Sequence, residues 1–175
     1  FHRQTAPWVE DEKVFRTSNG VTPPQMIDGD NDPNLVVYAS SPDRGLDTLL
    51  TIWPEVVAAK PEARLRVYYG FNAWFDARYA KDQKTMQWKN DMLKLMEEDP
   101  TIDYRGSIGQ EQLSKEIAEC GIWAYPTGFG EISCITAMRM QCNGAVPVCT
   151  RYAALHETVG HGIRMGEYLD NTIDI

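Results

Sequence analysis

Two residues stand out as able to do chemistry, an arginine and a glutamate that each follow an apolar run and lie beside glycine. Arg44 lies in the sequence SSPDRGL, directly after the apolar residues 35–39. Glu131 ends the sequence PTGFGE, which follows the apolar residues 122–125. A guanidinium can bind phosphate oxygens through two parallel hydrogen bonds, and a carboxylate accepts hydrogen bonds from hydroxyl groups. These residue types in glycine-containing loops indicate a site for a phosphate and for a sugar hydroxyl.

Both residues also have a purely structural interpretation. Arg44 could be an exposed side chain that pairs with Asp43 or Asp47, its neighbours along the chain. Glu131 could be an acidic residue at a helix N-terminus, where the helix dipole favours a negative charge. The position of Arg44 beside Gly45 favours phosphate binding, whereas the local sequence alone does not decide between the two interpretations of Glu131.

The stretch around Glu131 has the pattern of a strand, a loop, a helix and a second strand. The apolar run before it stops at Pro126, as expected of a buried strand. A helix is predicted over 132–142, because Asn143-Gly144 after it is typical of a left-handed helix end. The next strand is predicted over 145–149. Glu131 is therefore expected at a helix entrance, where free backbone N–H groups suit a phosphate or a sugar hydroxyl.

This stretch resembles the donor-binding motif of the retaining GT-B glycosyltransferases of the group 1 (family 4) type. That motif is a Glu, seven residues and a second Glu, followed by a short apolar stretch and Gly-x-Pro-Val or Gly-x-x-Pro-Val. Aligning it on residues 144–148 (GAVPV) places Glu131 on the first acidic position and Arg139 on the second. The family's first Glu is followed by Gly-Phe-Gly, and this sequence has other residues there: Ile132, Ser133 and Cys134.

The resemblance implies a role for each of these positions. In the family the first Glu contacts the hydroxyls of the donor sugar, which makes Glu131 a candidate catalytic residue. The second Glu accepts hydrogen bonds from the ribose, and the guanidinium of Arg139 cannot accept any. Eight residues apart on one predicted helix, Glu131 and Arg139 are expected to project toward the same rim, about 12 Å apart along the axis. Ser107 and Ile108, in the loop after a predicted strand, are expected to contact the base.

The SSPDRGL loop resembles the diphosphate-binding loop of the same family. The resemblance places Arg44 and Gly45 at the donor diphosphate, where Arg44 would neutralise the charge that develops on the leaving group. Ser41 takes the position at which many members have a second cation. A further similarity lies upstream, where Ser18-Asn19-Gly20-Val21 stands in place of the Pro-Asn-Gly-Val of the family's interdomain connector.

Apolar runs alternate with helical patterns along the chain. Strands are predicted near residues 35, 64, 102, 121 and 145, and further helices over 46–59, 79–96 and 110–119. This alternation predicts an α/β fold with a doubly wound, Rossmann-like parallel sheet and helices on both faces. Ligands of such sheets bind at the carboxyl ends of the strands, so the loops there are expected to share one rim: 40–45, 70–71, 106–109 and 126–131.

The resemblance also implies a domain organisation. Residues 1–33 are expected to form an interdomain connector or turn-rich leader, and residues 34–175 the Rossmann-like nucleotide-sugar-binding domain, the C-terminal half of a GT-B fold. An acceptor-binding N-terminal domain is the implied partner. The sequence begins with Phe1 rather than Met, so it is expected to be a domain fragment.

Composition excludes several other classes. The 175 residues carry a net charge of −8, which argues against nucleic acid and anionic membranes as partners. There is no apolar run of roughly 18–20 residues and no opening signal sequence, so no transmembrane segment is expected. The four cysteines form no C-x-x-C pair and indicate reduced, buried thiols in a cytoplasmic protein.

No cofactor or essential metal is expected. His156 and His161 are five residues apart, whereas a zinc-binding helix needs a spacing of four to place both on one face. The sequence also lacks the G-x-G-x-x-G and P-loop motifs. Four aromatic residues are interpreted as packing residues rather than as a platform for a ligand: Trp74, Phe75, Tyr79 and Trp88.

The function that the resemblance implies is transfer of a hexose from a UDP- or GDP-linked sugar to a hydroxyl acceptor, with retention. The alternative, motivated by Arg139, is a catalytically degenerate GT-B-like module that binds nucleotide weakly or contacts another protein. A flavodoxin-like or response-regulator-like domain is the third possibility. It ranks last because Asp43 stands without other acidic residues after the first predicted strand.

Overall fold

The computed structural model describes residues 7–15, 17–21 and 31–166, and these ranges contain six strands. The strands are β1 (Asp32–Ser40), β2 (Arg64–Tyr69), β3 (Ile102–Gly106), β4 (Cys120–Tyr125), β5 (Val146–Thr150) and β6 (Ile163–Met165). They form one sheet in the order β3-β2-β1-β4-β5-β6, and every neighbouring pair is parallel. The predicted α/β fold with a doubly wound parallel sheet is confirmed.

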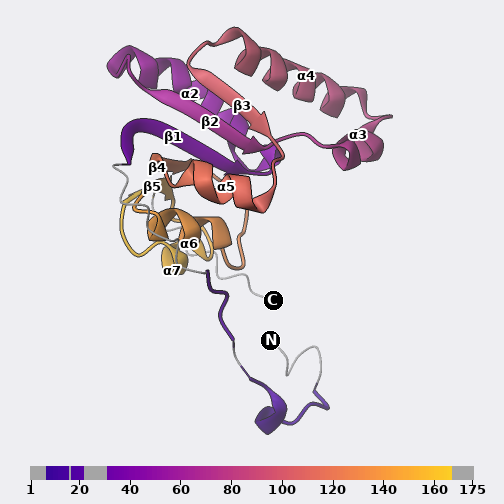
Figure 1. Ribbon diagram of the computed structural model, residues 1–175. Helices are drawn as coiled ribbons and strands as arrows, with labels where there is room; N and C mark the ends of the chain where they lie inside the picture. The colour runs from indigo at the N-terminus through magenta and orange to yellow at the C-terminus, as the bar shows by residue number, and fades with distance from the viewer. Residues whose placement is uncertain (1–6, 16, 22–30, 167–175) are drawn as a thin grey trace.

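Helices connect successive strands. The α-helices are α2 (Leu46–Ala59), α3 (Ala73–Tyr79), α4 (Gln83–Glu98), α5 (Gln110–Ile117), α6 (Ile135–Cys142) and α7 (Leu155–Thr158), and the 3₁₀ helices are η1 (Asp11–Lys13) and η2 (Pro42–Arg44). Figure 1 shows α2 and α4 on one side of the sheet and α5 and α6 on the other. Within the described residues, no helix is both long and apolar enough to cross a membrane.

Most predicted elements agree with the structure, and several details differ. Strand β6 was not predicted, because its three residues are all exposed and form no continuous apolar run. The helix predicted over 79–96 begins only at Gln83, since Asp82 caps it by accepting hydrogen bonds from the backbone and side chain of Thr85, and the preceding helix α3 was not predicted. Strand β1 already begins at Asp32, inside the predicted connector; residues 1–6, 16 and 22–30 of that connector lie outside the described residues.

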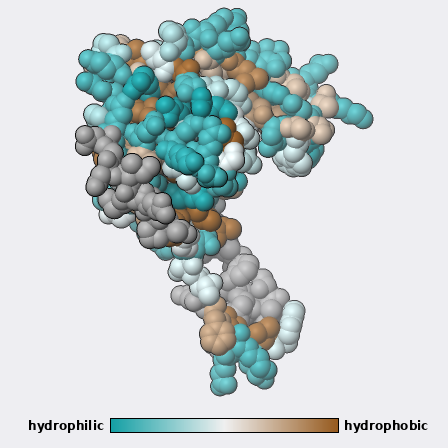
Figure 2. Space-filling model, in the orientation of Figure 1, coloured by the Kyte–Doolittle hydropathy of each residue, from teal (hydrophilic) through white to brown (hydrophobic). Residues whose placement is uncertain are grey.

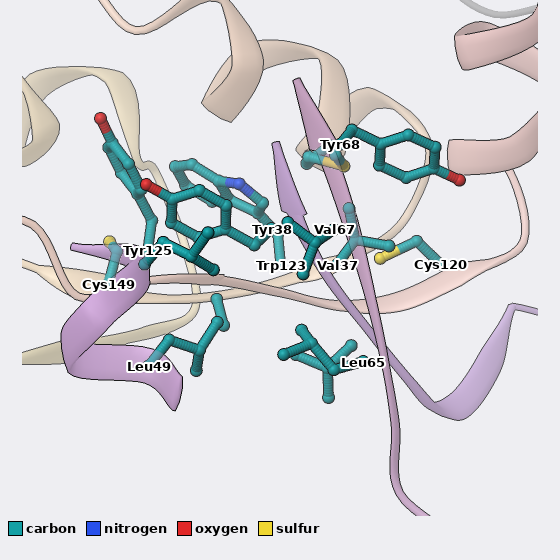
Figure 3. Close-up of a cluster of buried hydrophobic side chains, with 14 of the residues drawn as sticks. Val37, Tyr38, Leu49, Leu65, Val67, Tyr68, Cys120, Trp123, Tyr125 and Cys149 are labelled. Atoms are coloured by element: carbon teal, nitrogen blue, oxygen red, sulfur yellow. The ribbon is translucent and has the colours of Figure 1, made fainter. Parts of the chain in front are cut away.

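The core follows from the continuous apolar strands of a parallel sheet. Val37 and Val67 on neighbouring strands are fully buried, as is Trp53 on α2. Figure 3 shows the rings of Tyr38, Trp123 and Tyr125 gathered in this core. The ring centroids of Trp123 and Tyr125 are 5.2 Å apart in a stacked arrangement. Tyr125 is the last residue of β4, so its hydroxyl lies at the end of the strand beside the following loop.

The cysteines are unpaired, as predicted, but they do not share one environment. Cys120, Cys134 and Cys149 are buried, whereas Cys142 at the end of α6 is exposed. Burial raises the pKa of the Cys120 thiol to about 12. The prediction of buried thiols is therefore wrong for Cys142.

The order of the strands creates the place where a site can form. After β1 the chain runs outward through β2 and β3, and it then returns to the other side of β1 to place β4, β5 and β6. The loops that leave β1 and β4 therefore depart from neighbouring strands toward opposite sides. In parallel sheets this reversal opens a crevice at the carboxyl ends of the two strands, where ligands bind.

Candidate functional site

The loops after β1 and β4 are in direct backbone contact at this crevice. Gly45 has a φ of 106°, and a Cβ atom there would lie 2.3 Å from the carbonyl oxygen of Pro126. A left-handed φ and this approach both require glycine. The hydroxyl of Tyr38 also donates a hydrogen bond of 2.7 Å to the carbonyl of Ser41, which fixes the loop after β1 to its own strand. The two loops therefore form one rigid unit at the end of the sheet.

Arg44 and Glu131, which are 87 residues apart in sequence, are in contact where these two loops meet. Arg44 Nη1 lies 3.3 Å from Glu131 Oε1, and the exposed fractions of the two side chains are 34% and 12%. The sequence interpretation in which Arg44 pairs with Asp43 or Asp47 is not what the structure shows. The ion pair instead brings together the two residues expected to bind a diphosphate and a sugar.

Tyr125 completes this arrangement. Its hydroxyl donates a hydrogen bond of 2.6 Å to Glu131 Oε1, and Ser40 Oγ lies 3.2 Å from the same hydroxyl. Burial, followed by the hydrogen bond to Glu131, raises the pKa of Tyr125 to about 12, so the phenol stays protonated and donates. Both protein contacts of the carboxylate are thus made by Oε1, and among the described residues Oε2 has no partner.

The loop that carries Glu131 is held by hydrogen bonds between its backbone and two threonine hydroxyls. The Thr127 hydroxyl accepts a hydrogen bond from the Phe129 N–H at 2.9 Å, and the Thr127 carbonyl accepts one from Thr150 Oγ1 at 2.6 Å. Thr127 is the one polar residue among the described residues that is buried. The ring of Phe129 lies under the guanidinium of Arg44, with Cζ 3.9 Å from the ring centroid, which is a favourable cation–π distance.

A cavity of about 280 Å³ lies beside this group, between the ends of β2 and β3 and the helices α5 and α6. Ser107, Ile108 and Arg139 all line it, together with Thr136 and Gln110. Arg139 Nη1 donates a hydrogen bond of 2.6 Å to Gln110 Oε1. The structure therefore brings the two residues expected at the base together with the residue at the family's ribose position. Figure 2 shows that the surface over α5 is mostly hydrophilic.

Glu131 does not lie at a helix entrance. Helix α6 begins at Ile135, after Cys134, so the residues between Glu131 and α6 belong to the loop. The predicted spacing of Glu131 and Arg139 on one helix face is wrong for this reason. Within this segment Ile132 is 96% exposed and Cys134 only 6%, so the three residues in place of the family's Gly-Phe-Gly have different environments.

Three residues near this site were not predicted to belong to it. Tyr125 was assigned only to a strand, Phe129 to a loop, and Tyr69 to the end of another strand. A signal was present for the two tyrosines, since each is the last residue of a predicted strand and can bring a hydroxyl to the rim. The position of Phe129 under Arg44 depends on the fold of the loop and has no sequence signature.

The residues that the structure describes contain no group of three or more His, Cys, Asp or Glu side chains placed to hold a metal ion. His156 and Glu157 are neighbours on α7 and at the surface; His156 Nε2 lies 3.8 Å from Glu157 Oε1. His156 Nδ1 contacts the carbonyl of Ala153 at 2.7 Å.

The sequence matches no family model and no curated protein. Solved structures with the same fold are similar over most of the chain. The S. aureus protein TarM, in complex with UDP and α-GlcNAc-glycerol among other ligands, has a TM-score of 0.68 at 12% identity over 95% of this chain and 32% of TarM. Anabaena HepE, in complex with UDP and glucose, has a TM-score of 0.56 at 16% identity over 75% of this chain and 34% of HepE.

A third similar structure is the pneumococcal O-GlcNAc transferase GtfA in complex with UDP and GlcNAc. Its TM-score is 0.56 at 15% identity, and the match covers 87% of this chain and 28% of GtfA. The chain thus spans about a third of the length of these structures. Together with the parallel sheet and the crevice between β1 and β4, these similarities show that the chain shares its Rossmann-like α/β fold with part of these solved structures.

Proposed function

We propose that this chain is the donor-binding domain of a retaining glycosyltransferase that transfers a hexose from a nucleoside diphosphate sugar to a hydroxyl acceptor. The observation that carries the proposal is the ion pair between Arg44 and Glu131 at the end of β1 and β4, beside the cavity that Ser107, Ile108 and Arg139 line. A cation for a diphosphate, a carboxylate for sugar hydroxyls and a cavity for a nucleoside lie next to one another there. A nucleotide sugar has the same three parts, with the diphosphate between the nucleoside and the sugar.

The arrangement of Glu131 supports a role in holding the donor sugar. Arg44 and Tyr125 both contact Oε1, which fixes the plane of the carboxylate. Oε2 remains to accept a hydrogen bond from a sugar hydroxyl, and charge-assisted hydrogen bonds of this kind are among the strong ones. Because the side chain is only 12% exposed, it is oriented before the sugar arrives.

Arg44 would stabilise the leaving group. Breaking the bond between the sugar and the diphosphate places negative charge on a phosphate oxygen, and a positioned cation lowers the free energy of that transition state. The stack on Phe129 covers only a face of the guanidinium, so its N–H groups other than the one that contacts Glu131 can bind phosphate oxygens. No metal or other cofactor is part of this proposal.

The ligands of the structural neighbours support a uridine nucleotide as the first candidate. HepE was solved with UDP-glucose and GtfA with UDP and GlcNAc. The hexose, the retention of configuration and an acceptor-binding N-terminal domain come from the sequence resemblance. The unpaired cysteines support a reducing compartment such as the cytoplasm.

Calorimetric titration with UDP, GDP and ADP tests the proposal. Arg44→Ala should weaken binding of the preferred diphosphate by about 1.5–3 kcal/mol, the range for a hydrogen bond to a charged group. Arg64→Ala is the matched control, because Arg64 is an exposed arginine at the opposite end of β2 that pairs with Asp32. Equal effects of the two substitutions would contradict a phosphate site at Arg44.

Arg139 favours a second candidate function, a GT-B-like module without transferase activity. Its guanidinium, bonded to Gln110, occupies the position of the family's ribose-binding Glu and cannot accept a hydrogen bond from ribose hydroxyls. Such a module would bind nucleotide weakly or contact another protein. Absence of heat from all three nucleotides would support this candidate over the transferase.

A further inference from the structure

Arg44 borders a second opening, which is separate from the cavity that Ser107, Ile108 and Arg139 line. It is a groove of about 580 Å³ between the loop after β1 and the helices that follow β2. We call it the aromatic groove and define it by six of its lining residues: Tyr69, Trp74, Phe75, Tyr79, Asp43 and Asp47. Arg44 also lines it, so the groove begins where the proposed donor site ends.

Helix α3 presents aromatic side chains without burying them. Three of its seven residues are aromatic, and none of the seven is buried. Trp74 is 68% exposed. The interpretation of these aromatic residues as packing residues holds for Phe75, whose ring contacts that of Phe71 with centroids 5.1 Å apart, but it is wrong for Trp74. A short helix whose aromatic rings stay exposed is better suited to contact a ligand or a partner than to form part of a hydrophobic core.

The helix holds these rings in place. Asn72 caps α3 by accepting a hydrogen bond of 3.0 Å from the Phe75 N–H. Lys89 of α4 forms an ion pair with Asp76, which ties α3 to α4 (Figure 1). The rings of Phe75 and Tyr79 lie with centroids 4.7 Å apart. Helix α3 and the rings of Phe75 and Tyr79 are therefore held in place, and Trp74 projects from this fixed helix.

Tyr69 stands between the groove and the nucleoside cavity and lines both. It is half exposed, and its φ of 78° is unusual for a residue with a Cβ atom. Gly70 after it also has a positive φ, and the hydroxyl of Tyr104 accepts a hydrogen bond of 3.1 Å from the Phe71 N–H. Strained backbone conformations of this kind persist only where the surrounding packing maintains them, and they are concentrated at ligand sites.

The opposite wall carries two exposed carboxylates. Asp43 and Asp47 form no ion pair with any lysine or arginine in the part of the chain that the structure describes. Asp47 Oδ1 accepts only from the backbone and hydroxyl of the adjacent Thr48. Carboxylates disfavour an anionic ligand and accept hydrogen bonds from hydroxyl groups. A sugar ring offers both kinds of surface, an apolar C–H face and an edge of hydroxyls.

We propose that the aromatic groove binds a carbohydrate, with the sugar face against Trp74 and Tyr69 and its hydroxyls toward Asp43 and Asp47. Its assignment as the acceptor of the transfer rests on the proposed function, because Arg44 would bring the donor to the same edge. In that case the domain would contribute to acceptor recognition as well as to donor binding.

The indole N–H resonances of the five tryptophans provide a direct test. The Trp74 signal is assigned as the one that disappears in Trp74→Phe. The probes are the methyl glycosides of glucose, galactose, mannose and N-acetylglucosamine at millimolar concentration. At least one should shift the Trp74 resonance in a saturable way. Trp74→Ala should weaken its binding roughly threefold to tenfold, the range of one aromatic contact, and Asp47→Asn should weaken it as well.

Trp8→Ala is the matched control, since Trp8 is 79% exposed and lies outside the groove. UDP titration of Trp74→Ala separates the two proposals. The UDP affinity of this variant should equal that of the wild type. If the protein binds a glycoside but not UDP, the proposal for the groove stands and the proposal for the donor site is wrong. If no glycoside moves the Trp74 resonance, the proposal is wrong. It is also wrong if Trp74→Ala converts a dimer to a monomer in sedimentation velocity while glycosides have no effect, because the groove would then be a self-association surface.

Discussion

The Cα of Gly45 faces the carbonyl oxygen of Pro126 so closely that a Cβ atom would lie 2.3 Å from it. This contact joins the loop of Arg44 to the loop of Glu131, although these two residues are 87 positions apart in the sequence. The geometry of the candidate site therefore depends on a residue with no side chain.

Gly45→Ala should destabilise the protein and disturb the site. The substitution adds a backbone clash and forces a φ of 106° on a residue with a Cβ atom, a strain of order 1–3 kcal/mol. We expect a lower midpoint in urea unfolding and weaker UDP binding. Gly128→Ala in the neighbouring loop is the control, because its Cβ would meet no atom within 4 Å. A Gly45→Ala protein as stable as Gly128→Ala would contradict the close approach.

Tyr125→Phe should affect the sugar more than the nucleotide. The substitution removes the hydrogen bond to Glu131 Oε1 and leaves the ring in the core, so the carboxylate loses one of its two orienting contacts. We expect affinity for UDP-glucose to fall by about 0.5–1.5 kcal/mol, as for one hydrogen bond, and affinity for UDP to stay unchanged. Calorimetry with both ligands measures this difference. Tyr104→Phe is the control, because its hydroxyl also holds a hydrogen bond within the protein but lines neither opening. An equal loss for UDP would place Tyr125 outside sugar recognition.

Arg139→Glu should tighten binding of a nucleoside diphosphate. The new carboxylate lines the same cavity and can accept hydrogen bonds from the ribose, and the amide of Gln110 can rotate to donate to it. We expect UDP affinity to rise by about 1.5 kcal/mol, roughly tenfold. Arg139→Gln controls for removal of the positive charge. Loss of binding in Arg139→Glu would instead show that Arg139 is itself a phosphate ligand.

Glu116 should make stability depend on pH in the acid range. Its carboxylate accepts hydrogen bonds from Tyr68, Gln112 and Arg105, and these contacts, Arg105 foremost, lower its pKa to about 2. A depressed pKa contributes stability that is fully present above the unfolded value near 4.5 and is lost as the pH falls toward 2.

The measurement is the free energy of urea unfolding of wild type and Glu116→Gln between pH 7 and pH 2.5. At pH 7 the variant should be less stable by about 1.5–3 kcal/mol, and the difference should shrink as the solution becomes acidic. Glu111→Gln, which removes only an exposed pair with Lys115 on the same helix, should have little effect. A difference that is constant with pH would show that Glu116 acts through packing.

The alternation of apolar strands and helices determined the fold class and most element positions. Runs such as residues 35–39 are apolar at every position, which is the requirement of a strand buried on both faces. The same reasoning could not find β6, because an exposed edge strand of three residues has no such requirement. It also missed the short helix α3 and placed the start of α4 too early, at Tyr79, where the capping side chain of Asp82 starts the helix at Gln83 instead.

For the site, the sequence identified Arg44 and Glu131 by residue type and by their loops, and only the tertiary structure decided what they contact. The ion pair, the hydrogen bond from Tyr125 and the approach of Gly45 to Pro126 all join segments that are distant in sequence, because β1 and β4 are neighbours in the sheet. Local pattern describes a residue's own segment, whereas these contacts depend on strand order. The error in placing Glu131 at a helix entrance has the same origin, since the backbone of its loop is held by Thr127, Thr150 and Ala154 rather than by helical hydrogen bonds.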